Sequence, residues 1–115
     1  MATITYYTFP LSPFAYLAGT QVEEVAAKHG ATVQYRPFDL LKVFGEHGTL
    51  PPGKRHAARQ AHRLQELARV AKMHGLPINL KPAHWPTDPK PAVAAMIYAE
   101  QAGGGDLAAL THGIL

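Results

Sequence analysis

Ser12 is the residue whose type and position point most directly to chemistry. It follows an apolar and aromatic run at residues 3–9 and precedes Pro13, and a serine followed by a proline is a favoured start for a helix. The first N–H groups of a helix have no internal partner and carry the positive end of its dipole, so they attract anions. A thiolate held there would be stabilised by about 0.3–1 kcal/mol, before any hydrogen bond from the serine hydroxyl is added. The same pair also serves as a plain helix cap, and the spacing leaves both interpretations open.

Other catalytic and metal-binding chemistries have less support. The chain has no cysteine, which excludes disulfides, thiolate metal ligands and catalysis by a thiol of the protein. Its seven histidines are scattered and never four residues apart, so no helical metal site is indicated. A Gly-x-Ser-x-Gly segment is absent, and the glycines at 103–105 lack the Lys-Ser/Thr of a phosphate loop.

Basic residues are concentrated between positions 54 and 72. This segment holds six Lys and Arg side chains and a single acid, Glu66, within a chain whose net charge is only +3. Such a segment is typical of the solvated face of a helix, and it is also the pattern of a basic module that binds nucleic acid or another anion. No aromatic residues alternate with these cations along the sequence, which argues against a nucleic-acid partner.

The elements that would position Ser12 form a βαβ unit. The β-branched and aromatic run at residues 3–9 predicts a strand, and residues 32–38 predict a second one. One helix is expected between them, from Ser12 or Pro13 to about Ala27, with Gly30 as its stop. A helical crossover of this length predicts that the strands are parallel.

The rest of the chain is predominantly helical in its patterning. A glycine- and proline-rich loop at 45–53 precedes a long helix at 54–74, with an apolar stripe at Ala57, Ala61, Leu64, Leu67, Ala68 and Ala71. A proline-rich loop at 81–89, a helix from 91 to 102 and a last helix capped by Asp106 follow. We therefore predict an α/β fold with an N-terminal βαβ half at residues 1–44 and a helical lobe at residues 45–115.

Composition sets outer bounds on the protein. A length of 115 residues with 47% hydrophobic residues allows one domain at most, with a core. The first residues show neither a basic leader nor the apolar region of a secretory signal, and no apolar run is long enough to span a bilayer. A cytoplasmic protein that does not engage a membrane is expected.

The last helix suggests an incomplete fold. Leu107, Leu110, Ile114 and Leu115 have core-like spacing, and the sequence stops there without a capping residue. We expect this apolar face to be exposed or covered by another chain, and both edges of a two-stranded sheet to be open.

Four segments of the chain match the motifs of a known family. These are residues 7–17 (YTFPLSPFAYL), 36–41 (RPFDLL), 67–69 (LAR) and 84–89 (HWPTDP). They resemble the 2-hydroxychromene-2-carboxylate isomerases and the related kappa-class glutathione transferases. The resemblance implies a thioredoxin-like fold with a helical insertion, in which Ser12 occupies the position of the attacking cysteine of thioredoxins. The C-terminal half of that fold, with its cis-proline loop and final hairpin, has no counterpart in these 115 residues.

The resemblance also implies a reaction and its cofactor. Family members use glutathione to interconvert 2-hydroxychromene-2-carboxylate and trans-o-hydroxybenzylidenepyruvate in aromatic hydrocarbon breakdown. By analogy, Ser12 would hold the glutathione sulfur as a thiolate, which adds to the conjugated carbon chain and allows bond rotation. Gly53 and Lys54, together with Lys42, would contact glutathione or the substrate carboxylate, and Asp88 replaces the usual asparagine of the central loop.

Three functions therefore remain open at the level of the sequence. The first is a glutathione-dependent isomerase that acts on a small aromatic substrate as a homodimer, without nucleic acid or membrane. The second is a kappa-like glutathione transferase or peroxidase. The third is an interaction module built on the basic helix at 54–74.

Overall fold

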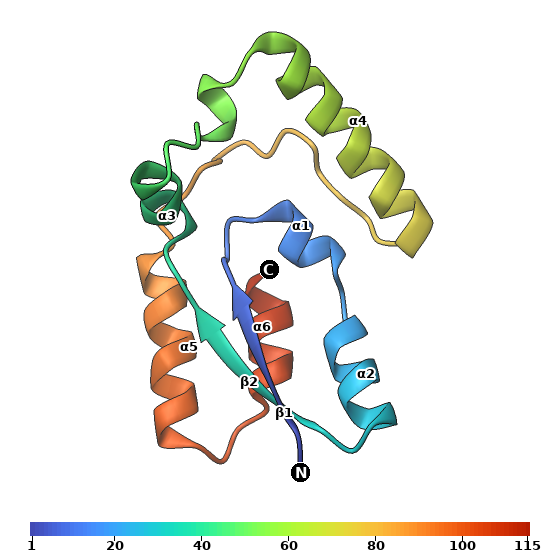
Figure 1. The fold of residues 1–115 in the computed structure, drawn as a ribbon, viewed down its shortest axis with the longest axis vertical. Coiled ribbons are helices and arrows are strands. Elements are labelled where there is room, and N and C mark those ends of the chain that lie inside the picture. The colour runs from blue at the N-terminus through green and yellow to red at the C-terminus, as the bar shows by residue number, and fades with distance from the viewer. The chain divides into compact units, whose positions relative to one another are not determined.

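The computed structural model describes residues 1–115, which form two short strands and six α-helices (Figure 1). In chain order the elements are β1 (Thr3–Thr8), α1 (Pro13–Leu17), α2 (Gln21–Lys28), β2 (Thr32–Pro37), α3 (Leu40–Glu46), the 3-10 helix η1 (Pro52–Lys54), α4 (Ala57–His74), α5 (Lys90–Ala102) and α6 (Leu107–Ile114). The chain divides into two compact units. Unit 1 comprises Met1–Phe38 and Pro86–Leu115, and unit 2 comprises Asp39–Trp85.

These units have different bounds from the predicted domains at 1–44 and 45–115. The difference arises because α5 and α6 pack in unit 1, where α5 contacts β2 and α6 contacts α5. An ion pair between Arg36 of β2 and Glu100 of α5 adds to this packing, with 2.6 Å between nitrogen and oxygen. Sequence patterns cannot reveal such a return of the chain, because the paired residues lie far apart in sequence.

The two strands form the predicted parallel pair, which confirms the βαβ arrangement. Thr3 lies beside Thr32 and Thr8 beside Pro37, without a bulge between them. Along β1 the exposed residues alternate with covered ones: Thr3, Thr5 and Tyr7 are exposed, while Ile4, Tyr6 and Thr8 are covered. This alternation follows from the two-residue period of a strand.

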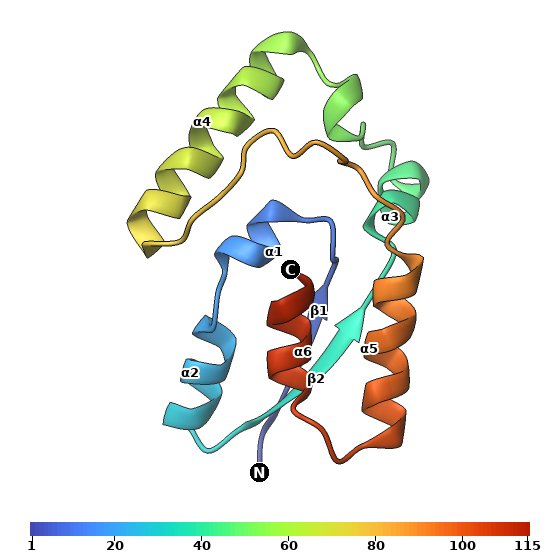
Figure 2. The ribbon, with the colours of Figure 1, turned by 180° about the vertical axis from the view of Figure 1, so that it is seen from behind.

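Different helices cover the two faces of the sheet in unit 1. Tyr6 and Tyr35 occupy paired positions on one face, with ring centroids 6.0 Å apart in an edge-to-face contact. Side chains of α2 and α6 reach this face, whereas the ion pair from Arg36 places α5 beside the other face. Figure 2 shows the arrangement from behind, with α6 in front of the strands.

The predicted helix between the strands is in fact two helices. α1 ends at Leu17 and α2 begins at Gln21, because Gly19 adopts a left-handed conformation with φ of 57° that cannot continue a right-handed helix. A second difference is α3, which forms in a stretch where no helix was predicted. Its N-cap is Asp39, whose carboxylate accepts a hydrogen bond from the Lys42 N–H at 3.0 Å.

Unit 2 is organised around α4, which is shorter than predicted at its start. His56 caps its N-terminus, and Gly75 ends it with φ of 66°. Part of the predicted apolar stripe is correct, since Leu67 and Ala71 are buried. Ala57, Ala61 and Ala68 are exposed instead, because the covered face runs along residues 63, 64, 67, 70 and 71.

The last helix is tied into unit 1 more firmly than expected. Asp106 caps α6 as predicted, through a hydrogen bond from the Ala109 N–H at 2.9 Å. The four residues expected to be exposed or covered by another chain are each partly covered within this chain, and the fully buried residue of α6 is Thr111. None of the helices is both long enough and apolar enough to cross a lipid bilayer.

Candidate functional site

Ser12 lies in the turn that connects β1 to α1. Its N–H donates to the Phe9 carbonyl at 2.9 Å, and its own carbonyl accepts from the Tyr16 N–H at 3.2 Å. Phe9 on one side and Leu17 on the other are buried, with 5% and 1% of their surfaces exposed. The half-buried serine is therefore held between two anchors in the core of unit 1.

The Ser12 hydroxyl caps α1, as predicted. The Ala15 N–H donates to Ser12 Oγ at 3.2 Å, and Ser12 has the extended backbone of an N-cap, with φ of −83° and ψ of 113°. A hydroxyl has two acceptor positions and one O–H donor. The cap uses one acceptor position, which leaves the O–H group able to donate to an anion.

The short length of α1 changes the electrostatic expectation at Ser12. The helix spans only five residues, and the dipole effect comes from unsatisfied groups in the first turn. Its contribution to a bound thiolate is therefore at the low end, about 0.3 kcal/mol. A hydrogen bond from the serine to a charged group would contribute more, about 1.5–3 kcal/mol.

Of the other predicted site residues, Asp88 lies in unit 1, whereas Lys42, Gly53 and Lys54 lie in unit 2. Lys42 is an exposed residue of α3. Gly53 and Lys54 form the end of η1, where the Lys54 N–H donates to the Pro51 carbonyl at 2.9 Å. The side chain of Lys54 is exposed, so this short helix presents a cation on an ordered backbone.

Asp88 has a local structural role. Its Oδ1 accepts a hydrogen bond from the Lys90 N–H at 3.0 Å, at the start of α5. This bond satisfies one of the donors that a helix N-terminus leaves without a partner. An asparagine would make the same contact through its amide oxygen, so the substitution noted in the sequence is compatible with this turn.

Two arginine–aromatic pairs in unit 2 were not predicted. The Arg55 guanidinium lies over the Phe44 ring, 5.7 Å from its centroid, and the Arg63 guanidinium lies over the Trp85 ring at 5.8 Å. The Arg55 Nε–H also donates to the Leu50 carbonyl at 2.9 Å. Sequence patterns do not reveal these pairs, because each aromatic partner lies outside the helical spacing that local rules cover.

A carboxylate-centred cluster in unit 1 was also missed. Glu23 Oε1 accepts a hydrogen bond from the Tyr35 hydroxyl and lies 2.8 Å from His112 Nε2. Burial opposes the ionisation of Glu23, but the bonds to Tyr35 and His112 outweigh it and lower the pKa of this carboxyl. Burial and the neighbouring Glu23 charge raise the pKa of Tyr35. The cluster therefore favours an ionised Glu23 carboxylate bound by the neutral Tyr35 phenol. We assign it a role in holding the fold together, not in catalysis.

No group of three or more His, Cys, Asp or Glu side chains is placed to hold a metal ion. The histidines are divided between the units. His112 joins the cluster with Glu23, and His56 Nδ1 accepts from the Ala58 N–H at 3.1 Å. The Ser12 turn is therefore the candidate functional site of the chain.

Comparison with known proteins places this geometry in context. Residues 3–112 match the profile of the family described as DSBA-like thioredoxin domain. A 2-hydroxychromene-2-carboxylate isomerase of Pseudomonas putida is 34% identical over 74 residues, which cover 64% of this chain and 36% of that protein. Glutathione S-transferase kappa 1 of Caenorhabditis elegans is 31% identical over 80 residues, or 69% of this chain and 35% of that protein.

The solved structure of a 2-hydroxychromene-2-carboxylate isomerase has the same fold. Its TM-score is 0.74 at 24% sequence identity, and the match covers 96% of this chain and 53% of that one. The predicted thioredoxin-like fold is therefore confirmed. The chain spans about half the length of this structural relative, and its aligned segments span 36% and 35% of the two sequence relatives.

Proposed function

Because this chain belongs to the family of DSBA-like thioredoxin domains, we propose that it is a glutathione-dependent isomerase, or the Ser12-bearing portion of one. The proposed reaction is the interconversion of 2-hydroxychromene-2-carboxylate and trans-o-hydroxybenzylidenepyruvate. The observation that carries the proposal is the Ser12 turn, in which a half-buried hydroxyl retains a donor after capping α1. Relatives named as isomerases of this substrate support the choice of reaction.

The residues around Ser12 suit a thiol cofactor. The chain has no cysteine, so a sulfur nucleophile must come from a bound molecule. The hydrogen bond from the Ala15 N–H holds Ser12 Oγ in place. This bond occupies an acceptor position of the oxygen and leaves the O–H group of Ser12 able to donate. Glutathione, when bound, would supply a sulfur nucleophile for reversible addition to a conjugated chain.

The chain's own residues would bind and orient glutathione and the substrate, and would not themselves form a covalent bond to the substrate. Ser12 would donate its O–H to the sulfur and thereby favour the thiolate over the thiol. Lys54 and Lys42 are exposed cations that would bind carboxylates of the cofactor or substrate. The homodimer expected from the resemblance stays a prediction.

Ser12→Ala tests the proposal directly. Loss of a hydrogen bond worth about 1.5–3 kcal/mol should raise the pKa of bound glutathione by about one to two units and slow isomerisation about ten- to hundredfold. The measurement is the ultraviolet absorbance of the thiolate as a function of pH in the complex with glutathione, together with the isomerisation rate.

Asp106→Ala provides the matched control for this experiment. Both substitutions remove an N-cap, whose bond lengths are 3.2 Å for Ser12 and 2.9 Å for Asp106. Each should cost about 1 kcal/mol of stability, but only Ser12→Ala should shift the thiolate titration. If the two variants titrate alike, Ser12 is a cap and nothing more. If the protein does not bind glutathione, the proposed function is wrong.

A kappa-like glutathione transferase or peroxidase is the second candidate, because one relative is named as a kappa transferase. The two activities differ in their use of glutathione. An isomerase releases the thiol at the end of each turnover, whereas a transferase retains it in the product. Glutathione consumed in proportion to the product formed would therefore favour the transferase.

A further inference from the structure

β1 forms an edge of the sheet that no other strand of this chain covers. The sheet contains only β1 and β2, which pair in parallel without a bulge. In Figures 1 and 2 β2 flanks β1 on one side only. Because an unpaired edge presents a row of backbone donors and acceptors to another strand, the outer edge of β1 is a potential binding surface.

Hydrogen bonds at the two ends of the sheet show which residues of β1 point outward. The Thr32 N–H donates to the Ala2 carbonyl at 3.0 Å, and the Phe38 N–H donates to the Thr8 carbonyl at 3.1 Å. The backbone groups of successive residues point to alternate sides of a strand, so the even-numbered residues of β1 face β2. The residues that direct their N–H and C=O groups to the outer edge are therefore Thr3, Thr5 and Tyr7.

The two outer edges of the sheet differ in their protection against pairing. Natural sheets protect exposed edges with charged side chains, prolines or bulges. Pro37 of β2 precedes Phe38 and therefore faces away from β1, so the outer edge of β2 lacks an N–H donor at this position. β1 reads Thr-Ile-Thr-Tyr-Tyr-Thr, without a charge, a proline or a bulge. The edge of β1 is thus the one suited to pairing.

The sequence of β1 complements itself when two copies run antiparallel. If Thr5 lies opposite Thr5 of a second copy, Thr3 lies opposite the copy's Tyr7, and the residues of each such couple can exchange both N–H···O bonds. On the other face Ile4 then lies opposite the copy's Tyr6, which is a favourable pairing of a β-branched with an aromatic side chain. No like charges oppose each other in this register, because β1 carries none.

We propose that two copies of this chain associate through the outer edges of their β1 strands, antiparallel about a two-fold axis at Thr5. The joined sheet has a β2 strand at each end. Because Pro37 interrupts the donors of both outer edges, the assembly closes as a dimer and does not extend into a filament. The interface uses neither Ser12 nor glutathione, so it is independent of the proposed function.

Amide exchange of the full ¹⁵N-labelled chain at low and high protein concentration tests this interface by NMR. The outward N–H groups of Thr3, Thr5 and Tyr7 gain partners only in the dimer, so their exchange should slow about tenfold or more as the dimer becomes populated. Ile4 and Tyr6 are internal controls from the same strand, because their N–H groups already face β2. Their exchange should change much less with concentration.

Substitutions at Thr5 test the position of the two-fold axis, with association measured by sedimentation velocity. Thr5→Pro removes the central outward donor from both copies and should raise the dimer dissociation constant about tenfold or more. Thr5→Val is the matched control, because it keeps the N–H and the branched shape. It should leave the dissociation constant within about threefold of the wild type.

A charge pair at the same position gives a reading if Thr5→Pro folds poorly by circular dichroism. Thr5→Lys and Thr5→Glu each place like charges opposite each other across the axis, so each variant alone should associate weakly. An equal mixture of the two places opposite charges together, and it should associate about fivefold or more tightly than either variant alone.

Three results would overturn the inference. A chain that stays monomeric up to millimolar concentration would leave the β1 edge to a strand from a different polypeptide. A dimer in which the outward amides exchange as fast as in the monomer would use another surface. Oligomers that continue to grow with concentration would contradict the closed, two-fold arrangement.

Discussion

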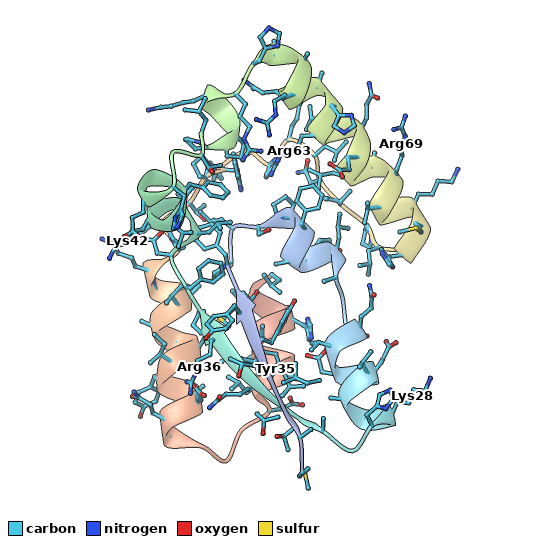
Figure 3. All side chains as sticks on the ribbon, in the orientation of Figure 1. Lys28, Tyr35, Arg36, Lys42, Arg63 and Arg69 are labelled. Atoms are coloured by element: carbon cyan, nitrogen blue, oxygen red, sulfur yellow. The ribbon has the colours of Figure 1, made fainter.

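Glu23 joins three elements of unit 1 through a single carboxylate oxygen. Glu23 belongs to α2, and its Oε1 accepts a hydrogen bond from the Tyr35 hydroxyl of β2. The same oxygen lies 2.8 Å from His112 Nε2 of α6. In Figure 3 Tyr35 lies among the strands at the centre of this unit. Both side chains of this contact are largely covered, with 22% of His112 and 24% of Glu23 exposed, so solvent screens their interaction only in part.

The depressed pKa of Glu23 predicts a pH dependence of stability. Its carboxyl is more acidic in the folded chain than its ordinary value of 4.5. The charged form therefore adds stability above the unfolded pKa, and this contribution is lost as the pH falls through the folded pKa. Glu23→Gln should lower the free energy of unfolding by about 1 kcal/mol at neutral pH, with a deficit that shrinks below about pH 4.

Urea unfolding at a series of pH values measures this effect. Glu46→Gln is the control, because Glu46 is an exposed carboxylate of α3 outside the cluster. It should change the free energy of unfolding by no more than about 0.5 kcal/mol at neutral pH. A deficit in Glu23→Gln that stays constant down to acidic pH would show that the loss is one of packing and not of charge.

Helix ends and breaks define the elements around Ser12. The polypeptide that follows Ser12 forms one short helix, turns at Gly19 and starts a second helix at Gln21. This break keeps α1 brief, so that Ser12 lies beside a single turn that is anchored by buried Leu17. Since an alanine or leucine at the break would favour one continuous helix, Gly19 decides how the Ser12 turn is held.

Opposite effects are expected from two glycine substitutions in unit 1. Gly19 has φ of 57°, a conformation that costs other residues about 1–2 kcal/mol. Gly113 lies within α6, and an added Cβ there would meet nothing within 4 Å. Gly19→Ala should therefore destabilise the chain by about 1 kcal/mol, and Gly113→Ala should be neutral or stabilising by up to about 1 kcal/mol.

Chemical denaturation followed by circular dichroism compares the two variants under the same conditions. The amide exchange of α2 should rise in Gly19→Ala and stay unchanged in Gly113→Ala. A destabilisation of equal size in both variants would mean that the break between α1 and α2 has no special conformational requirement.

The whole molecule consists of two units with opposite charge. Unit 2 carries eight Lys and Arg and three Asp and Glu, a net charge of +5, whereas unit 1 carries three and five, a net charge of −2. The basic segment seen in the sequence therefore belongs to one compact unit. Unit 1 consists of two separate stretches of the chain, and hydrogen bonds between residues 64 and 89 positions apart join these stretches.

This division predicts independent responses to core substitutions. Met96 of α5 and Leu67 of α4 are each 2% exposed, and they lie in unit 1 and unit 2 respectively. Shortening either side chain to alanine should cost about 2–5 kcal/mol. Met96→Ala should reduce amide protection in β1 and β2 while sparing α4, and Leu67→Ala should do the reverse.

Hydrogen exchange followed by mass spectrometry of peptides from each unit distinguishes the outcomes. Each variant is the control for the other, since both remove a buried side chain from a helix. If both variants lower the protection of all elements equally, the chain unfolds as one cooperative body and the two units are not energetically separate.

The sequence alone determined the local elements and their caps. Ser12 and Asp106 cap their helices as predicted, and the parallel strands follow from two β-branched runs joined by a helical crossover. These features depend on hydrogen bonds and sterics within a few residues, or on the length of one connection. For this reason a reading of the sequence could predict them.

Only the tertiary structure decided which distant residues meet. The pairing of Arg63 with Trp85 and of Glu23 with His112 depends on where the chain returns, and so does the assignment of α5 and α6 to unit 1. Local propensities do not predict such long-range contacts, because the free energy that selects them comes from packing of the whole unit. The sequence therefore indicated the Ser12 turn, whereas the contact between Arg63 and Trp85 emerged only from the fold.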